Sequence, residues 1–145
     1  MYTDVAVSIG FSAIFGNNWC YGSWPDNWIG KNIAILEFYP FVLSLSLWGN
    51  QLCNQCVLFF TDNEALVHVI NKQSCRDPSL MSFVRKLVSI CLQYNILFIA
   101  KHIPRVHNTL GDYLSRLQVA SFKKMAPVSM SRSPTEIPPH LLPQN

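Results

Sequence analysis

The sequence predicts an α/β domain built on a five-stranded mixed sheet with helices on both faces. Three early strand-like segments are followed by two units in which a β-branched and aromatic run leads into a helix. Between them lies an apolar segment of helical length, residues 32–48. We therefore expect three antiparallel strands, one helix, and then two parallel strands with their helices.

The first two strands are expected in residues 4–15. After Met-Tyr-Thr, Asp4 opens the stretch Asp-Val-Ala-Val-Ser-Ile-Gly-Phe-Ser-Ala-Ile-Phe. Its alternating β-branched and aromatic residues are typical of a strand that continues through a turn into a second strand. Asp4 is then expected at a strand end.

Residues 32–48 form the apolar segment, and Glu37 is their one carboxylate. The segment is apolar enough for a helix that is buried on most of its circumference. A carboxylate there is costly to bury unless it is neutralised or paired with a cation. Because Pro40 removes a helical hydrogen bond, we expect a kink or a late helix start that leaves Glu37 in the first turn.

The next strand, residues 57–62, ends in Thr-Asp, and Asn63 with Glu64 can start a helix. Asp4 and Asp62 thus both follow a threonine at an expected strand end. If their strands are parallel neighbours, the two carboxylates meet at a crevice outside the carboxyl ends of the strands, where open α/β sheets place their sites.

The last strand, residues 96–103, stops at Pro104. Asn108 is expected to cap a short helix that carries Asp112 one turn in. Only eight Asp and Glu occur in 145 residues. Four of these eight, Asp4, Glu37, Asp62 and Asp112, lie in or at the edges of apolar segments. Acids this scarce in such positions favour a site for a cation, and a divalent metal ion is the natural candidate.

The order of these elements and two longer phrases resemble the ribonuclease H domain of retroelement reverse transcriptases, most closely the DIRS-type elements. The phrases are residues 60–72 and 102–116, and the resemblance runs from about Tyr2 to about Leu117. The chain departs from the family pattern at Arg105, where the family usually has glycine, and at Gly111, where it has alanine. The resemblance implies that four residues bind metal: Asp4, Glu37, Asp62 and Asp112.

The same resemblance implies endonucleolytic hydrolysis of the RNA strand of RNA–DNA hybrids. Two ions roughly 3.5 to 4 Å apart can clamp both oxygens of an in-line displacement. Mg²⁺ prefers hard oxygen ligands, and Mn²⁺ is the alternative ion. In this assignment Asp4 bridges both ions, Glu37 and Asp62 hold one, and Asp112 holds the other.

Other residues are candidates for proton transfer or substrate binding. Some family members carry a histidine before the last helix, and we prefer His107 to His102, although a surface histidine without a role is the competing interpretation. Arg85 and Lys86 could contact phosphate, or simply belong to a solvated helix face. The residues expected to contact nucleic acid are Asn63, Asn71, Lys72, Gln73, Ser74 and Asn108.

We expect a ribonuclease H-like domain in residues 1–118 and a disordered Pro/Ser-rich tail or linker in residues 119–145, which hold five of the nine prolines. No apolar run is expected to span a bilayer, because Glu37 and Pro40 interrupt the best candidate. The N-terminus lacks the features of a signal peptide. Cys53 and Cys56 have a spacing used by zinc and redox sites, but no second pair follows, so reduced thiols are favoured.

These observations indicate a cytoplasmic or nuclear protein without a membrane partner. Since the chain starts almost directly on a strand, we expect a fragment of a longer polyprotein, with a reverse transcriptase polymerase domain in front of Met1. Two alternatives remain. One is a catalytically degenerate copy that still binds nucleic acid, and the other is a different nuclease on the same fold, such as an integrase or a resolvase.

Overall fold

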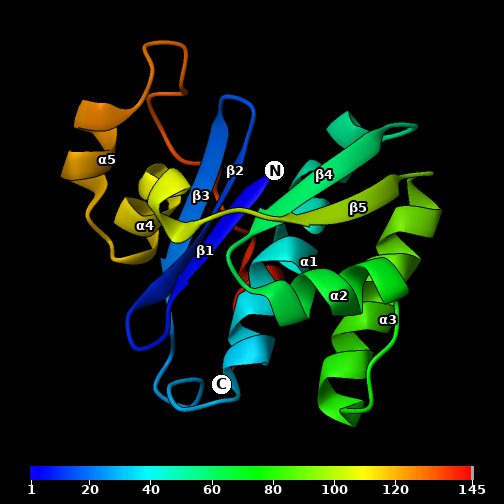
Figure 1. The fold of residues 1–145 in the computed structure, drawn as a ribbon. Coiled ribbons are helices and arrows are strands. Elements are labelled where there is room, and N and C mark those ends of the chain that lie inside the picture. The colour runs from blue at the N-terminus through cyan, green and yellow to red at the C-terminus, as the bar shows by residue number, and fades with distance from the viewer. Residues whose placement is uncertain (145) are drawn as a thin grey trace.

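The computed structural model describes residues 1–144 and contains one mixed sheet with the strand order β3-β2-β1-β4-β5 (Figure 1). The strands β1, β2 and β3 are antiparallel neighbours, whereas β4 runs parallel to β1 and β5 runs parallel to β4. The expected three antiparallel and two parallel strands are confirmed. Their bounds are β1 Tyr2–Ala6, β2 Gly10–Phe15, β3 Asn18–Ser23, β4 Cys56–Thr61 and β5 Leu97–His102.

Helices cover both faces of the sheet, as expected (Figure 1). The long helix α1 crosses β1, β2 and β4 and packs against α3, while α4 lies against β1, β2 and β3 and contacts α5. The helix α2 contacts β5. The helices are α1 Ile33–Leu52, α2 Glu64–Lys72, α3 Pro78–Gln93, α4 Thr109–Ser115 and α5 Val119–Met125, with short 3-10 turns η1 Arg105–His107 and η2 Pro139–Leu141.

Helix α1 is continuous through Pro40, so the expected late start is wrong and Glu37 falls in the second turn. The side chain of Asn32 caps the helix by accepting from the backbone N–H of Ala34. Contrary to the expectation about spanning length, this helix is long and apolar enough to cross a membrane by length and composition, but 61% of the window is buried. The buried core helix of a globular protein also meets these criteria of length and composition. Burial of its apolar side chains outweighs the backbone hydrogen bond that Pro40 removes from the helix.

Polar contacts attach α4 to the sheet. Asn108 occupies the N-cap position but makes no side-chain cap bond; its Nδ2 instead donates to the backbone oxygen of Thr3 in β1 at 2.9 Å. The hydroxyl of Ser12 in β2 donates to the backbone oxygen of Gly111 at 2.9 Å. A Cβ on Gly111 would lie 2.7 Å from Oδ1 of Asn108. A larger residue here would force the side chain of Asn108 to shift.

The segment 119–144 differs from the expected disordered tail. It begins with α5, whose Phe122 is buried against Trp19. The segment then returns along β3, where the backbone N–H of Thr135 donates to the oxygen of Trp19 at 2.7 Å. Near its end, Gln144 accepts a hydrogen bond from the indole of Trp28. Proline-rich composition did not prevent packing, because the segment covers an exposed sheet edge and satisfies two buried indoles. The remaining residue of that expectation, 145, lies outside the described residues.

We predict that Gly111→Ala destabilises the protein by about 1–3 kcal/mol, although alanine is the better helix former. The added methyl would push the Asn108 amide away from Thr3 and loosen α4 from the sheet. Urea unfolding would measure the effect, with Ala120→Gly as a control for helix propensity alone. A stabilised Gly111→Ala variant would contradict the packing argument.

Candidate active site

The register of β1 and β4 brings two of the expected acids to one level of the sheet. Tyr2 pairs with Phe60 in this parallel pair of strands. Asp4 and Asp62 each come two residues later in the same chain direction, so they follow the pair at matching positions. Asp4 lies in the middle of β1, not at a strand end, whereas Asp62 directly follows β4. The prediction that neighbouring parallel strands carry these acids is confirmed.

Asp4 is the most enclosed acid, with an exposed fraction of 7%. Its Oδ2 accepts a hydrogen bond of 2.5 Å from the hydroxyl of Ser115 at the end of α4. Burial raises the pKa of Asp4 to about 6, and the charges of Asp112 and Asp62 act in the same direction. The bond from Ser115 and the charge of Arg105 oppose this rise. Asp4 therefore lies within electrostatic reach of two other expected acids.

Glu37 approaches the same region from α1. Its carboxylate accepts a hydrogen bond from the side-chain amide of Asn63, the residue after Asp62. Asn63 also caps α2, because its Oδ1 accepts from the backbone N–H of Leu66 at 3.1 Å. Burial raises the pKa of Glu37, and the charge of Asp62 adds to the rise. A cap residue thus fixes the position of Glu37 relative to Asp62.

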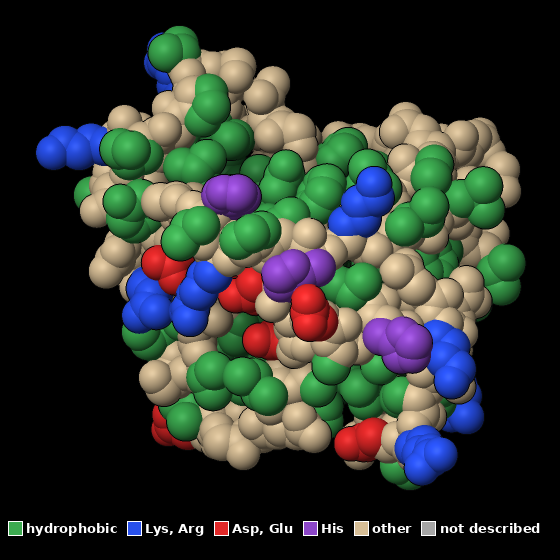
Figure 2. Space-filling view, viewed as in Figure 1, with side chains coloured by type: hydrophobic (Ala, Val, Ile, Leu, Met, Phe, Trp, Pro, Cys, Tyr) green, Lys and Arg blue, Asp and Glu red, His purple; other side chains and the backbone are tan. Residues whose placement is uncertain are grey.

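Asp112 lies on α4 and is paired with two arginines. Its Oδ1 accepts from Nε of Arg116 at 3.0 Å and lies 3.8 Å from Nη2 of Arg105. Arg105 begins the turn η1 with a negative backbone φ, so the position where the family usually has glycine requires no left-handed conformation in this chain. Figure 2 shows Asp and Glu side chains gathered near the middle of one face, with Lys or Arg and histidine side chains beside them.

The four acids suit a divalent hard cation in ligand chemistry but are not assembled around one. Within residues 1–144, no group of three or more His, Cys, Asp or Glu side chains is placed to hold an ion. Three of the acids are instead held by protein groups: Asp4 by Ser115, Glu37 by Asn63, and Asp112 by its arginines. Carboxylate oxygens remain the ligands that Mg²⁺ prefers, and a cation would relieve their mutual repulsion. A bound ion would have to share these carboxylates with Ser115, Asn63 and the arginines, each of which occupies one oxygen of its carboxylate.

The two candidate histidines are both exposed but differ in position. His102 ends β5 in register with Thr61, the residue before Asp62. His107 lies in η1, where it lines a pocket of about 350 Å³ with Tyr2 and Asn108. The register places His102 beside the strand end that carries Asp62, so the preference for His107 gains no support from the strand geometry.

Three of the residues expected to contact nucleic acid have their side chains engaged within the protein. Asn71 exchanges two hydrogen bonds with the backbone of Ala100 in β5, at 2.9 and 2.7 Å. Asn108 and Asn63 hold Thr3 and Glu37, as described above. Lys72, Gln73 and Ser74 are exposed at the end of α2. Contact with nucleic acid stays a prediction for all six residues. Lys72, Gln73 and Ser74 are exposed and free to make it, whereas the three asparagines already bond within the protein.

Sequence reasoning missed Ser115, Arg116 and the site contact of Arg105. A signal was present, because Ser115 and Arg116 follow Asp112 at the i+3 and i+4 spacing that places side chains on one helix face. The partner of Ser115, Asp4, is 111 residues away in the sequence. That contact could not be read from local spacing.

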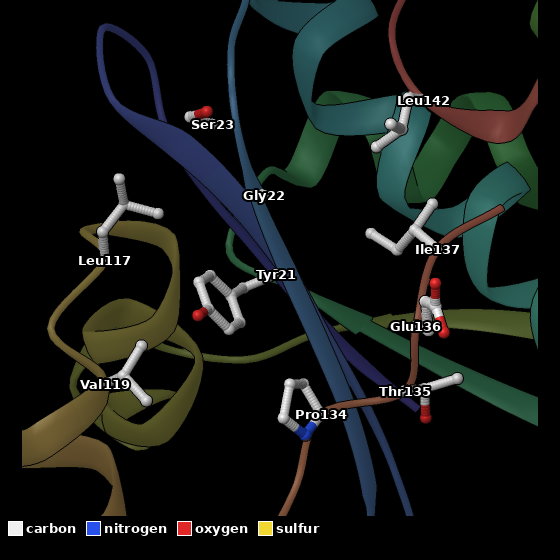
Figure 3. Close-up of a pocket in the computed structure, with 10 residues that line it drawn as sticks. All are labelled: Tyr21, Gly22, Ser23, Leu117, Val119, Pro134, Thr135, Glu136, Ile137 and Leu142. Atoms are coloured by element: carbon white, nitrogen blue, oxygen red, sulfur yellow. The ribbon is translucent and has the colours of Figure 1, made fainter. Parts of the chain in front are cut away.

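A larger pocket, about 490 Å³, lies away from the acids (Figure 3). It is bounded by β3 at Tyr21, by the turn between α4 and α5 at Leu117, and by the C-terminal segment at Pro134 and Ile137. None of the four site acids lines it. The pocket lies between β3 and the C-terminal segment, and it is separate from the candidate site.

We predict that Asp4→Asn stabilises the metal-free protein at pH 7 and flattens its pH dependence. The pKa of Asp4 is about 6 in the folded state against an ordinary 3.8, so between these values the folded state retains a proton that the unfolded chain has released. This contribution to stability is present below about pH 4 and is lost as the pH rises through about 6, by about 3 kcal/mol at most. Urea unfolding in EDTA from pH 4 to 7 would measure it. An unchanged slope in the variant would contradict the prediction.

No protein-family model matches the chain, and no curated protein sequence matches it. Solved structures are similar in fold. LC11-RNase H1 in complex with an RNA/DNA hybrid is 20% identical, with a TM-score of 0.56 and coverage of 78% of this chain and 90% of that chain. RNase H1 from the halophilic archaeon Halobacterium salinarum NRC-1 is 13% identical, with a TM-score of 0.56 and coverage of 81% and 96%. The chain therefore has the fold of ribonuclease H1, as the resemblance in its sequence implied.

Proposed function

We propose that this chain is a ribonuclease that hydrolyses the RNA strand of RNA–DNA hybrids by internal cleavage. The observation that carries the proposal is the parallel register of β1 and β4, which brings Asp4 beside Asp62. The charge of Asp112 raises the pKa of Asp4, and the charge of Asp62 raises the pKa of Glu37. Glu37 also accepts a hydrogen bond from Asn63, the residue after Asp62. The likeness in fold to ribonucleases H1 supports the same reaction.

Hydrolysis of a phosphodiester requires an activated water and stabilisation of the leaving 3′ oxygen, and two bound Mg²⁺ ions, or Mn²⁺, would supply both. Asp4, Glu37, Asp62 and Asp112 would hold them. Ser115 and Asn63 orient the carboxylates of Asp4 and Glu37. His102 and His107 are both exposed and each is able to carry a proton to or from solvent, His102 next to the strand end that carries Asp62.

We further propose that the domain belongs to a retrotransposon reverse transcriptase polyprotein of the DIRS type, acting in the cytoplasm or nucleus. The support is the pair of phrases in residues 60–72 and 102–116. The polymerase domain of that polyprotein would be its partner in holding the hybrid.

A catalytically degenerate copy that binds nucleic acid is the second candidate. The observation that favours it is the pairing of Asp112 with two arginines, together with the absence of an assembled metal group within residues 1–144. Cleavage of a labelled RNA–DNA hybrid in Mg²⁺ separates the two candidates. Binding without cleavage by the unaltered protein, in Mg²⁺ and in Mn²⁺, would favour the degenerate copy.

We predict that Asp62→Asn reduces hybrid cleavage by more than the roughly hundredfold that loss of an outer metal contact costs, without lowering the unfolding temperature. The substitution removes a ligand charge from a strand end and leaves the apolar core intact. Asp26→Asn, which alters an exposed acid in the loop after β3, is the matched control and should cleave normally. Normal cleavage by Asp62→Asn would rule out its role as a ligand.

We also predict weak, salt-sensitive binding of the hybrid by the isolated chain. The connection between α2 and α3, residues 73–77, is short and carries one arginine, so it supplies no basic protrusion to grip the duplex. Each phosphate neutralised contributes about −0.9 to the logarithmic salt slope on a B-form duplex. Fluorescence anisotropy in EDTA should detect binding only at low salt, with recovery when a polymerase domain is fused before Met1. Tight, salt-insensitive binding would contradict this.

A further inference from the structure

Arg105 and Arg116 contact the same oxygen of Asp112 in different ways. Arg116 follows Asp112 by four residues at the end of α4, and its Nε donates a hydrogen bond of 3.0 Å. Arg105 reaches Asp112 from η1, and its Nη2 lies 3.8 Å from Oδ1, too far for a hydrogen bond. The side chain of Arg105 is 59% exposed. Arg116 is thus a local partner within the helix, whereas Arg105 is a loosely held cation.

The charge of Arg105 acts on more than Asp112. It lowers the pKa of Asp4 and that of Glu37, against the larger rise that burial causes in each. These two acids come from β1 and α1, and Asp112 comes from α4. The guanidinium of Arg105 is therefore within electrostatic reach of acids on three separate elements. No other basic side chain is among the causes that shift both carboxyls.

We propose that Arg105 is a built-in counter-ion of the acid site and competes with a divalent metal ion for it. The inference rests on the proposed role of the four acids as metal ligands. An exposed ion pair stabilises a protein by at most about 1 kcal/mol, so the Arg105–Asp112 contact can be broken without unfolding. A divalent ion at Asp112 would carry twice the charge of the guanidinium and would repel it.

Competition by Arg105 explains why the acids interact through their charges but do not form a metal-binding group within residues 1–144. In the resting state Arg105 neutralises part of their negative charge, so the carboxylates can keep their bonds to Ser115 and Asn63. An ion that arrives at Asp112 would have to displace the guanidinium of Arg105. The unaltered protein should consequently bind metal more weakly than a variant without the charge at position 105.

The test is isothermal titration of Mn²⁺ alone into the full chain. Arg105→Gln keeps a polar side chain of similar reach and should bind Mn²⁺ up to roughly fivefold more tightly than the unaltered protein. Arg105→Lys keeps the charge and should bind within about twofold of the unaltered protein. Arg85→Gln removes the same charge from the exposed face of α3 and is the matched control. It should leave the affinity nearly unchanged.

Equal affinities for Arg105→Gln and Arg85→Gln would overturn the proposal, and so would weaker binding by Arg105→Gln. Absence of Mn²⁺ binding in every protein would overturn it as well, because there would be nothing for Arg105 to compete with. The titration contains no nucleic acid. Tight Mn²⁺ binding by Arg105→Gln in a protein that cleaves no hybrid would therefore uphold the competition while refuting the proposed ribonuclease activity.

Discussion

The candidate site depends on the parallel pairing of β1 with β4. This pairing is the junction between the antiparallel half of the sheet and the parallel half, and it is set by the Tyr2–Phe60 register and a bond from the Phe60 N–H to the oxygen of Met1. A slip of one residue would turn one of the two acid-bearing segments toward the opposite face. Helix α1 crosses both halves from one side, so the same element that connects β3 to β4 also supplies Glu37.

Polar contacts fix the helix that carries the fourth acid. Asn108 bonds to Thr3, Ser12 bonds to Gly111, and Ser115 bonds to Asp4, so α4 is fixed to β1 and β2 at three points along its length. Buried polar groups of this kind are costly unless all are satisfied. Within residues 1–144, no buried side-chain nitrogen or oxygen lacks a partner. The helix that carries Asp112 is therefore held in one orientation.

Repulsion among the carboxylates is reduced by neighbouring residues for which the sequence predicted another role or none. Asn63 was expected to contact nucleic acid, but it caps α2 and holds Glu37. Arg105 was noted as a departure from glycine, yet its guanidinium lies 3.8 Å from Asp112, and its charge also lowers the pKa of Asp4 and of Glu37. The described residues 119–144 differ from the expected disordered tail for a related reason. Proline-rich composition describes the local chain, whereas the packing of residues 119–144 depends on the edge of β3 and on the indoles of Trp19 and Trp28.

The sequence by itself determined the five strands and the helices α1 to α4, and it singled out the four acids as candidates, because hydrophobic periodicity and the scarcity of Asp and Glu are local properties of the chain. Tertiary structure decided that Asn63 meets Glu37 and that Ser115 meets Asp4. Ser115 and Asp4 are 111 residues apart in the sequence, and Asn63 and Glu37 are 26 residues apart. Such contacts follow from strand register and helix docking, and no local pattern encodes them.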